Sequence, residues 1–419
     1  MKETRFKQTE IGLIPEDWEI RKLGSIFKFI PNNTISRDNL VNQGTVMNVH
    51  YGDILIKYGS ILDIKNNDIP FINDSIISNS KFNEFAKDGD ILIADTAEDE
   101  MVCKATELYN IENRKLVSGL HTMWIRPIIE FKPKYLGYFF NSTFYHNQIL
   151  PLIQGTKVCS VSKGAIKDTY VSIPLENEQN KIASALTSID NLLLSLDKLI
   201  EKKRLIKQGA MQELLTGKKR LPGFTGEWIE KRLGEIGEII KESINPQLYR
   251  NQSFSEYSMP AYDLNKQPEI KYGEEMFSNR TKIDGTVLLY NKLNVRQRRI
   301  WYIENCKQNS ICSMEFLPYK VYRDYLKFFY YKLSIDSVVN YFVGISKGTS
   351  NSQKRISPND FLDFKVKYPR ELQEQKAIAT VLSSIDKEIE SLEDKKAKYE
   401  QIKLGMMQQL LTGKIRLIS

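Results

Sequence analysis

Two stretches of this 419-residue chain, offset by 196 positions, have nearly the same sequence. Residues 178–221 and 374–417 align without a gap, and 23 of the 44 positions are identical. A repeat of this length indicates that one supersecondary unit is used twice. The chain therefore has to fold as two copies of one module.

Both stretches have the pattern of a long helix. Their apolar residues recur every three or four positions, which is the spacing of a coiled-coil seam. Neither stretch contains proline, and Thr-Gly at 216–217 and 412–413 predicts the helix ends. The first helix is predicted from Gln179 to Leu215, a length on the order of 55 Å. The seam residues are Ile182, Leu186, Ile189, Leu193, Leu196 and Ile200 in the first copy, and Ile378, Leu382, Ile385, Ile389 and Leu392 in the second.

A narrow apolar seam with charged opposite faces needs a partner. The other copy in the same chain can supply it, because two helices separated by a globular module can pack antiparallel. The alternative is that each helix packs on its own globular module. We favour the intramolecular pair, since the seam is too narrow to suit a broad domain surface.

The parts that precede the two helices are weaker repeats with shared landmarks. Trp18 and Trp228 lie in similar octapeptides, and Gly155-Thr156 corresponds to Gly348-Thr349. Alternating and β-branched runs predict strands, and the aromatic segments after Tyr135 and Tyr325 predict short helices. The predicted strands cover residues 52–56, 90–94, 166–173, 285–290 and 361–366.

The predicted fold is α+β. Two mixed α/β globular domains are separated by two long helices that pair as an antiparallel coiled coil, which gives a pseudo-twofold internal repeat. The globular domains are predicted at 1–175 and 221–370, and the helical regions at 176–220 and 371–419. A shared frame with divergent contents suits a protein that recognises two different things with one geometry.

Composition narrows the class of protein. The net charge of +8 is compatible with a polyanionic partner without requiring one. No apolar run reaches the roughly 18–20 residues needed to cross a bilayer, and the first residues lack the apolar core of a signal peptide. Four cysteines in a chain of this length do not make a disulfide framework. The expected location is the cytoplasm.

The sequence carries no recognisable catalytic or metal-binding pattern. It lacks a G-x-x-x-x-G-K-[ST] phosphate loop and any Pro-Pro pair, which an amino-methylating enzyme would show after Asn or Asp. The three histidines are scattered, and Cys306 and Cys312 have no second ligand pair. We interpret the acidic run 95–100 as a loop rather than a metal site, and Asp190 as helix surface charge. We therefore predict no catalytic residue and no metal.

The repeated EQ-x-x-IA-x-x-L-x-S-ID…LLTGK-x-RL segment resembles the specificity subunit of type I restriction–modification systems. The Pro-x(3–4)-Glu-Gln sequence before each helix and the Asp-Trp-Glu-Ile-Arg-Lys-Leu-Gly start at 17–24 also fit, and the resemblance covers the whole chain. It implies a non-catalytic subunit whose two target recognition domains each read half of a bipartite double-stranded DNA site. The helix pair would hold these domains at a fixed separation.

The resemblance also implies partners and cofactors. Two methylation subunits would bring S-adenosylmethionine and methylate adenine N6, and restriction subunits would act as the motor and nuclease. S-adenosylmethionine, ATP and Mg²⁺ would be bound by these partner subunits, and none by this chain. No membrane partner is implied.

Base contacts require Arg, Lys, Asn, Gln and small hydroxyl side chains on loops that reach a groove. Such residues gather at the two Gly-Thr landmarks and after the strand predicted at 285–290. The loop equivalent to the latter in the first copy, 95–99, is acidic, so either the two domains read different sequences or this loop faces a protein. Each candidate could instead belong to a solvated loop. The candidates are Gln154, Gly155, Thr156, Lys157, Ser160, Ser162 and Lys163 in the first domain, and Asn291, Lys292, Asn294, Arg296, Arg298, Arg299, Lys347, Gly348, Thr349, Ser350, Asn351, Gln353, Lys354 and Arg355 in the second.

Two other classes of function remain open. A self-contained DNA methyltransferase or nuclease with a degenerate motif would modify or cut DNA when purified alone. A coiled-coil scaffold protein would organise protein partners without touching DNA, and footprinting of two separated half-sites by the assembled complex would exclude it.

The second Gly-Thr landmark supplies a direct test of the DNA-reading assignment. Replacing residues 347–355 with a neutral linker should abolish recognition of one half-site and leave the folded complex intact, because base-reading groups are removed from a loop. Electrophoretic binding assays on cognate and scrambled half-sites measure the effect. Unchanged sequence-specific binding would contradict the assignment.

Overall fold

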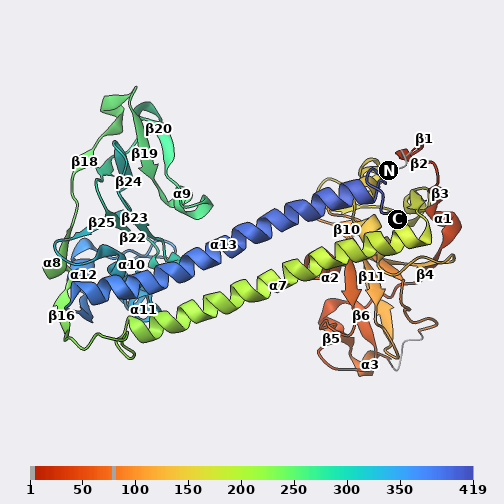
Figure 1. Cartoon of the computed structure of the whole chain (residues 1–419), viewed down its shortest axis with the longest axis horizontal. Coiled ribbons are helices and arrows are strands. Elements are labelled where there is room, and N and C mark those ends of the chain that lie inside the picture. Colours follow the sequence, from red (N-terminus) through yellow and green to blue (C-terminus); the bar gives the residue numbers. More distant parts are fainter. Residues whose placement is uncertain (1–4, 78–81, 419) are drawn as a thin grey trace. The chain divides into compact units, whose positions relative to one another are not determined.

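The structure, a computed structural model, describes residues 5–77 and 82–418. It divides into two compact units that do not follow a single cut of the chain (Figure 1). Unit 1 consists of Met1–Asp197 and Lys395–Ser419, and unit 2 of Lys198–Asp394. Each unit thus contains one globular domain and a part of each of the two long helices.

The two long helices are confirmed. Helix α7 spans Glu176–Leu214 and helix α13 spans Leu372–Leu410, with 39 residues in each. Both end as the Thr-Gly pairs predict: Gly217 and Gly413 adopt φ values of 74° and 68°, in the left-handed region that favours glycine.

Within unit 1, the first half of α7 packs antiparallel to the last half of α13. Asp190 of α7 lies 2.6 Å from Lys403 of α13 and accepts a 2.8 Å hydrogen bond from the Tyr138 hydroxyl. Two turns further along α7, Asp197 lies 2.6 Å from Lys396 of α13. Higher positions on α7 meet lower positions on α13, as antiparallel pairing requires.

Unit 2 repeats these contacts with the roles of the helices exchanged. Asp386 of α13 lies 2.5 Å from Lys207 of α7 and accepts a 2.7 Å hydrogen bond from the Tyr331 hydroxyl. Arg204 of α7 pairs with Glu393 of α13 at 2.6 Å. The predicted antiparallel pairing of the two helices is therefore confirmed.

The helix starts also pack on their own globular domains, so the alternative interpretation holds for the first three turns. Ile182 and Leu186 are fully buried in the core of unit 1, together with Leu411, which directly follows α13. Ile378 and Leu382 are buried in the core of unit 2. Of the remaining seam residues, Leu196, Ile200 and Ile389 are buried, and Ile189, Leu193, Ile385 and Leu392 are partly buried.

A buried carboxylate at the start of each helix binds an arginine that follows the end of the other helix. In unit 1, Glu178 accepts two 2.8 Å hydrogen bonds from Arg416 and one of 2.9 Å from the Trp18 indole. In unit 2, Glu374 accepts two from Arg220, at 2.5 and 2.6 Å. These bidentate ion pairs explain why both Glu-Gln and the final Arg-Leu are repeated in the sequence.

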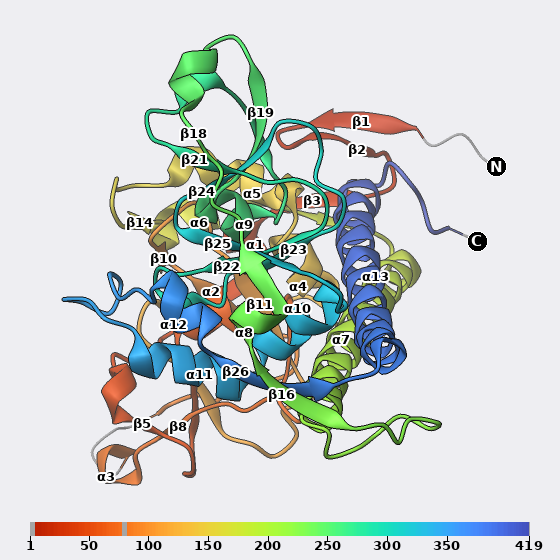
Figure 2. The ribbon, with the colours of Figure 1, turned by 90° about the vertical axis from the view of Figure 1, so that its left-hand side faces the viewer.

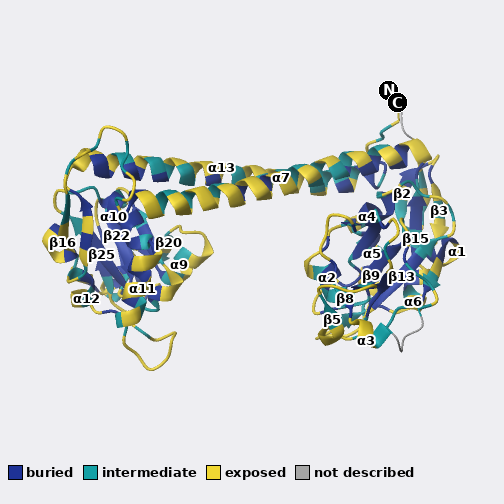
Figure 3. Ribbon diagram, turned by 90° about the horizontal axis from the view of Figure 1, so that it is seen from below, coloured by how far each residue is buried: buried dark blue, intermediate teal, exposed yellow. Residues whose placement is uncertain are grey.

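The globular domain of unit 1 is built on two main sheets, whose central strands are mostly buried while many surrounding loops are exposed (Figure 3). The larger has the order β4-β13-β9-β11-β7, and the smaller β12-β6-β8-β5. The larger sheet consists of β4 Phe27–Ile30, β13 Thr122–Pro127, β9 Ile91–Ala94, β11 Ala105–Tyr109 and β7 Ile61–Asp63; the smaller consists of β12 Leu116–Ser118, β6 Met47–Val49, β8 Phe71–Ile72 and β5 Leu40–Val41.

Three two-stranded pairs and several short helices complete this domain. The pairs are β1 Phe6–Thr9 with β2 Gly12–Pro15, β3 Glu19–Lys22 with β15 Tyr170–Ile173, and β10 Thr96–Ala97 with β14 Cys159–Ser160. The helices are α1 Leu23–Ile26, α2 Tyr51–Ile56, α3 Asp74–Ile77, α4 Tyr135–Phe140, α5 Thr143–Ile149 and α6 Lys163–Lys167, with 3₁₀ turns η1 Arg37–Asn39 and η2 Leu150–Leu152.

Unit 2 has the same plan. A four-stranded sheet has the order β17-β25-β22-β23, and a five-stranded sheet β18-β21-β24-β19-β20. The first contains β17 Gly237–Ile239, β25 Phe316–Val321, β22 Val287–Asn291 and β23 Ile300–Ile303; the second contains β18 Ser243–Ile244, β21 Arg280–Lys282, β24 Ser310–Ser313, β19 Ser253–Tyr257 and β20 Glu269–Tyr272; β16 Trp228–Arg232 pairs with β26 Lys365–Pro369. The helices are α8 Leu233–Ile236, α9 Met259–Leu264, α10 Leu326–Ser334, α11 Asp336–Ile345 and α12 Pro358–Leu362, with η3 Pro246–Tyr249, η4 Gly273–Glu275 and η5 Val295–Gln297.

The α+β class is confirmed, as are the strands predicted at 90–94 and 285–290 and the two aromatic helices. The strand predicted at 52–56 is wrong, because these residues form helix α2. The His50 side chain accepts a hydrogen bond from the Gly52 amide and so starts a helix there. The strands predicted at 166–173 and 361–366 are partly wrong, since each range begins in a short helix, α6 or α12.

The glycine positions of the long helices give a matched pair of variants. Gly413→Ala should lower the free energy of unfolding by about 2 kcal/mol or more. The alanine would have to keep the left-handed backbone conformation of Gly413, and its Cβ would overlap the Pro15 ring. Gly209→Ala should raise it by up to about 1 kcal/mol, because a Cβ there meets nothing within 4 Å inside a helix. Urea unfolding measures both. Equal effects would contradict the proposed helix end.

Candidate nucleic-acid interface

In unit 2 the two candidate DNA-binding segments lie against each other. Arg355 forms β-bridges with both Leu293 and Lys347. The Asn294 amide donates to the Lys354 carbonyl at 2.8 Å. We call residues 291–299 and 346–356 the unit 2 loop pair. Figure 2 shows its second loop extending from the domain between α11 and α12, and Figure 3 shows that loop as exposed.

Unit 1 has an equivalent arrangement. The acidic loop after β9 forms strand β10, which pairs antiparallel with β14 in the first Gly-Thr segment. The Val161 amide also donates to the Asp95 carbonyl at 3.1 Å. We call residues 95–101 and 154–161 the unit 1 loop pair. The two loop pairs have the same frame, with acidic residues in one where the other has basic residues.

Two of the candidate residues have structural roles. Asn291 is only 2% exposed, and its side-chain oxygen accepts a hydrogen bond from the Leu293 amide at 3.0 Å. Ser162 caps helix α6 by accepting a hydrogen bond from the Ala165 amide at 3.1 Å. The exposed candidates are Gln154, Gly155, Thr156, Lys157, Ser162 and Lys163 in unit 1, and Arg296, Arg298, Lys347, Gly348, Thr349, Ser350, Asn351, Gln353 and Arg355 in unit 2; Ser160, Lys292, Asn294, Arg299 and Lys354 are half-buried.

Three arginines of the unit 2 loop pair are already engaged in ion pairs. Arg299 binds Asp263 of α9 through two hydrogen bonds of 2.7 and 2.8 Å, and this contact lowers the pKa of the Asp263 carboxyl. The other two pairs join Arg298 to Asp336 at 2.6 Å and Arg355 to Glu315 at 3.0 Å. These contacts fix both loops to the domain.

The first loop of the unit 2 loop pair has an unusual backbone. Asn294 and Arg298, which flank the turn η5, both have φ of 52°. Non-glycine residues in this region carry backbone strain, and such strain is found preferentially at functional sites. The loop is therefore held in a specific, costly conformation.

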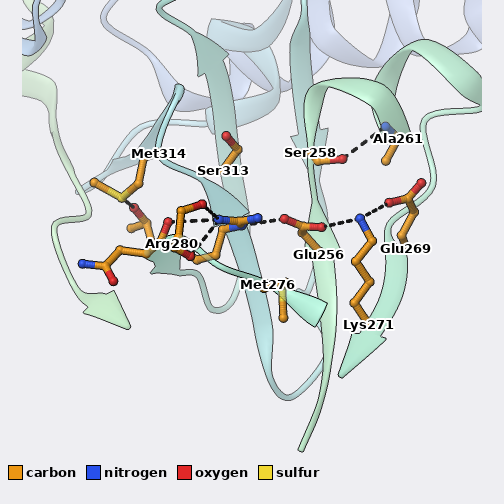
Figure 4. A network of polar contacts seen from close by, with 12 residues as sticks. Glu256, Ser258, Ala261, Glu269, Lys271, Met276, Arg280, Ser313 and Met314 are labelled. Carbon is orange, nitrogen blue, oxygen red and sulfur yellow. Dashed lines mark hydrogen bonds and ion pairs between the residues drawn. The ribbon is translucent and has the colours of Figure 1, made fainter. Parts of the chain in front are cut away.

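A buried charge network supports the neighbouring sheet (Figure 4). Glu256 of β19 is 1% exposed and binds Lys271 of β20 at 2.8 Å and Arg280 of β21 at 2.5 Å. Burial alone would raise the pKa of the Glu256 carboxyl, but the two cationic hydrogen bonds outweigh it and lower the pKa. The network joins three strands of one sheet.

The same sheet leads to the unit 2 loop pair. Strand β19 is followed by helix α9, whose first turn is capped by Ser258 through a 3.3 Å hydrogen bond from the Ala261 amide (Figure 4). Asp263 of this helix binds Arg299. The loop thus rests on a helix that is fixed to a sheet cross-linked by ion pairs.

A family model described as "Type I restriction modification DNA specificity domain" matches residues 15–207 and again residues 225–401. The two matches cover most of the chain, one for each copy of the repeat. The chain belongs to the type I restriction–modification DNA specificity family. The resemblance stated from the Glu-Gln and Leu-Leu-Thr-Gly-Lys motifs is confirmed.

Two relatives are similar in sequence to this chain over almost their whole length. The MjaX and MjaVIII type I restriction enzyme specificity subunits of Methanocaldococcus jannaschii are 29% and 25% identical to this chain, and each alignment covers 99% of this chain and 97% of the relative. A crystal structure of the S subunit of a type I system from M. genitalium matches with a TM-score of 0.56 over 94% of this chain and 96% of that chain, at 16% identity. That structural likeness concerns the fold.

Sequence reasoning missed several parts of this interface. Gln297, exposed in the η5 turn, lay inside the candidate run but was not singled out. The partners Asp263, Glu315 and Asp336 gave no signal, since each is distant in sequence from the arginine it binds. The acidic loop 95–99 and its basic counterpart after β22 differ in charge, and this difference alone indicated from sequence that these loops matter.

Within residues 5–77 and 82–418, no three His, Cys, Asp or Glu side chains are grouped so that they could hold a metal ion. None of the helices in the same ranges is both long and apolar enough to cross a membrane. The four cysteines, including Cys306 and Cys312, are free thiols.

The Glu256 network predicts a pH dependence. A carboxyl whose pKa is lowered by folding stabilises the protein above its unfolded pKa, and this contribution is lost as pH falls through the folded pKa. The urea midpoint of the native protein should therefore drop more steeply between about pH 5 and pH 3 than that of Glu256→Gln. Glu242→Gln, at an exposed pair with Lys282, is the control and should keep the native slope. Identical slopes for the native protein and Glu256→Gln would contradict the role of the network.

Proposed function

We propose that this chain is the DNA-recognition subunit of a type I restriction–modification enzyme and that each globular domain reads one half of a bipartite double-stranded site. The observation that carries this proposal is the repeated loop pair. The same frame appears twice, with acidic residues 95–100 on one copy and basic residues 292–299 on the other. One frame that carries two different sets of side chains suits the reading of two different half-sites.

In this proposal the target recognition domains are residues 1–175 and 221–370, and the conserved helical regions are 176–220 and 371–419. The helical regions join the recognition domains and bind the methylation subunits. Leu194, Leu205 and Leu404, which are 54%, 62% and 53% exposed on the long helices, would be accessible to such a partner.

The chain itself is proposed to be non-catalytic and to act in the cytoplasm. Two methylation subunits would bring S-adenosylmethionine and methylate adenine N6 within the recognised site. Restriction subunits, where present, would use ATP and Mg²⁺ to translocate and cut DNA. The recognition subunit would bind the DNA and position it, and the partner subunits would catalyse methylation and cleavage.

Recognition by this chain needs two kinds of contact. Lysines and arginines that meet phosphates supply affinity without sequence information, and side chains that reach base edges supply specificity. A bipartite site doubles the number of base contacts, because each domain contributes its own. Losing one domain's contacts should therefore remove specificity for one half-site alone.

Methylation mapping tests the proposal directly. Single-molecule sequencing of host DNA should show N6-methyladenine at one bipartite motif, and deletion of this gene should abolish methylation at that motif while other motifs keep theirs. Complementation with the gene should restore it. Methylation that persists in the deletion strain would contradict the proposal.

Purified protein separates the remaining possibilities. The chain alone should neither methylate nor cleave DNA, and it should do so only together with methylation or restriction subunits. Activity of the isolated chain would identify a self-contained enzyme instead. Absence of DNA protection by the assembled complex would identify a scaffold.

A further inference from the structure

We infer that Arg296 and Gln297, at the tip of the first loop of the unit 2 loop pair, are base-reading residues, with Arg296 binding a guanine and Gln297 an adenine. This inference rests on the proposed DNA-recognition function and names the contacts through which it acts. It adds Gln297 to the candidate residues and separates Arg296 from the other arginines around it.

Among the four arginines of the loop pair, Arg296 is the one without an ion pair to the described residues. Arg298, Arg299 and Arg355 each hold a carboxylate of the domain at 2.6 to 3.0 Å. Arg296 is exposed, and the described residues offer its guanidinium no hydrogen bond or ion pair. Binding DNA with Arg296 therefore breaks no existing contact, whereas using one of the other three would break an ion pair with a carboxylate of the domain.

Gln297 shares this freedom. Its side chain is exposed and makes no hydrogen bond to the described part of the chain. Its backbone is fixed, because the Gln297 amide donates to the Asn294 carbonyl at 2.9 Å. A free side chain on a fixed backbone is what a base-reading position requires.

The support beneath both residues is rigid. They occupy the η5 turn between left-handed Asn294 and Arg298, and Val295 anchors the turn in the core of unit 2 at 3% exposure. The Arg298 amide closes the turn on the Val295 carbonyl at 2.9 Å. The turn is therefore already ordered before DNA binds, so binding loses little conformational entropy. The strained backbone holds the two side chains in place for this contact.

The chemistry of the two side chains selects their targets. The guanidinium fork matches the O6 and N7 acceptors of guanine, and the glutamine amide matches the N7 acceptor and N6 donor of adenine in the major groove. Residues that follow each other in a 3₁₀ turn rise by about 2 Å and point about 120° apart, and the length of the arginine and glutamine side chains lets both reach the same or adjacent base pairs.

The lysines of the loop pair have a different role. Lys292, Lys347 and Lys354 form no ion pair within the described residues, and an ammonium group is a point charge that suits phosphates. They flank the tip and would hold the loop against the DNA backbone. Phosphate contacts and base contacts can be distinguished experimentally, because only the former change the salt dependence of binding.

The experiment uses the complete complex of this chain with its methylation subunits. Binding and methylation are measured on a panel of duplexes in which each position of the bipartite motif is replaced in turn. Arg296→Ala should relax discrimination at one guanine of one half-site by roughly 5- to 150-fold, and Gln297→Ala should do so at an adjacent or identical base pair. The other half-site should remain fully discriminated, and the salt slope should be unchanged.

Matched variants keep the result interpretable. Lys347→Ala should weaken binding to every duplex and reduce the salt slope by about one. Arg323→Ala removes another exposed arginine of unit 2, one that forms no ion pair with the described residues, and should change nothing. Circular dichroism and assembly with the methylation subunits verify that each variant is folded.

The outcomes separate this inference from the function on which it rests. Unaltered discrimination by Arg296→Ala and Gln297→Ala would overturn the base-reading assignment while the native complex still reads a bipartite motif. A uniform loss of affinity with a lower salt slope would also overturn it, since Arg296 would then contact phosphate. A native complex without any bipartite preference would overturn the proposed function itself.

Discussion

The architecture depends on one ion pair made twice. A carboxylate at the start of each long helix, Glu178 or Glu374, is buried and must be neutralised, and the arginine that does so follows the end of the other helix. Breaking a buried pair of this kind typically costs about 3–5 kcal/mol, because one charge is left uncompensated. Neither helix can therefore start correctly unless the other has ended correctly. This reciprocity requires that the same Glu-Gln and Arg-Leu residues occur in both copies.

A second repeated contact fixes the register of the pairing. The Asp of each Ser-Ile-Asp motif binds a tyrosine of its own domain and a lysine of the opposite helix, as Tyr138, Asp190 and Lys403 do in unit 1. Asp190 was interpreted from sequence as surface charge; the structure gives it a specific role between domain and helix. Tyr138 holds Asp190 to its own domain and Lys403 holds it to the opposite helix, so sliding α7 by one turn would lose both contacts and sliding α13 would lose the lysine contact.

Much of the frame could be predicted from the sequence because its signals are periodic. The seam spacing and the terminal Thr-Gly pairs specify two helices, and the repeat specifies that they pair. Short elements were harder: residues 52–56 read as a strand but form α2, since a run of five residues cannot separate the two periods. The contact between the two loops of each pair could not be predicted at all. The bridges from Arg355 to Leu293 and Lys347 join residues that only the folded chain brings together, so sequence alone could name both segments but not their contact.

The division of unit 1 has a consequence for synthesis. Its core includes Met407, Leu410 and Leu411, which emerge from the ribosome after all of residues 198–394. At about 5–20 residues per second, that delay is roughly 10 to 40 s, during which the apolar face of Ile182 and Leu186 has no permanent cover. The first module of this chain is translated first but completes its folding last. Its transient apolar surface is a natural substrate for chaperones, and its vulnerability to aggregation is set by the length of the module inserted into it.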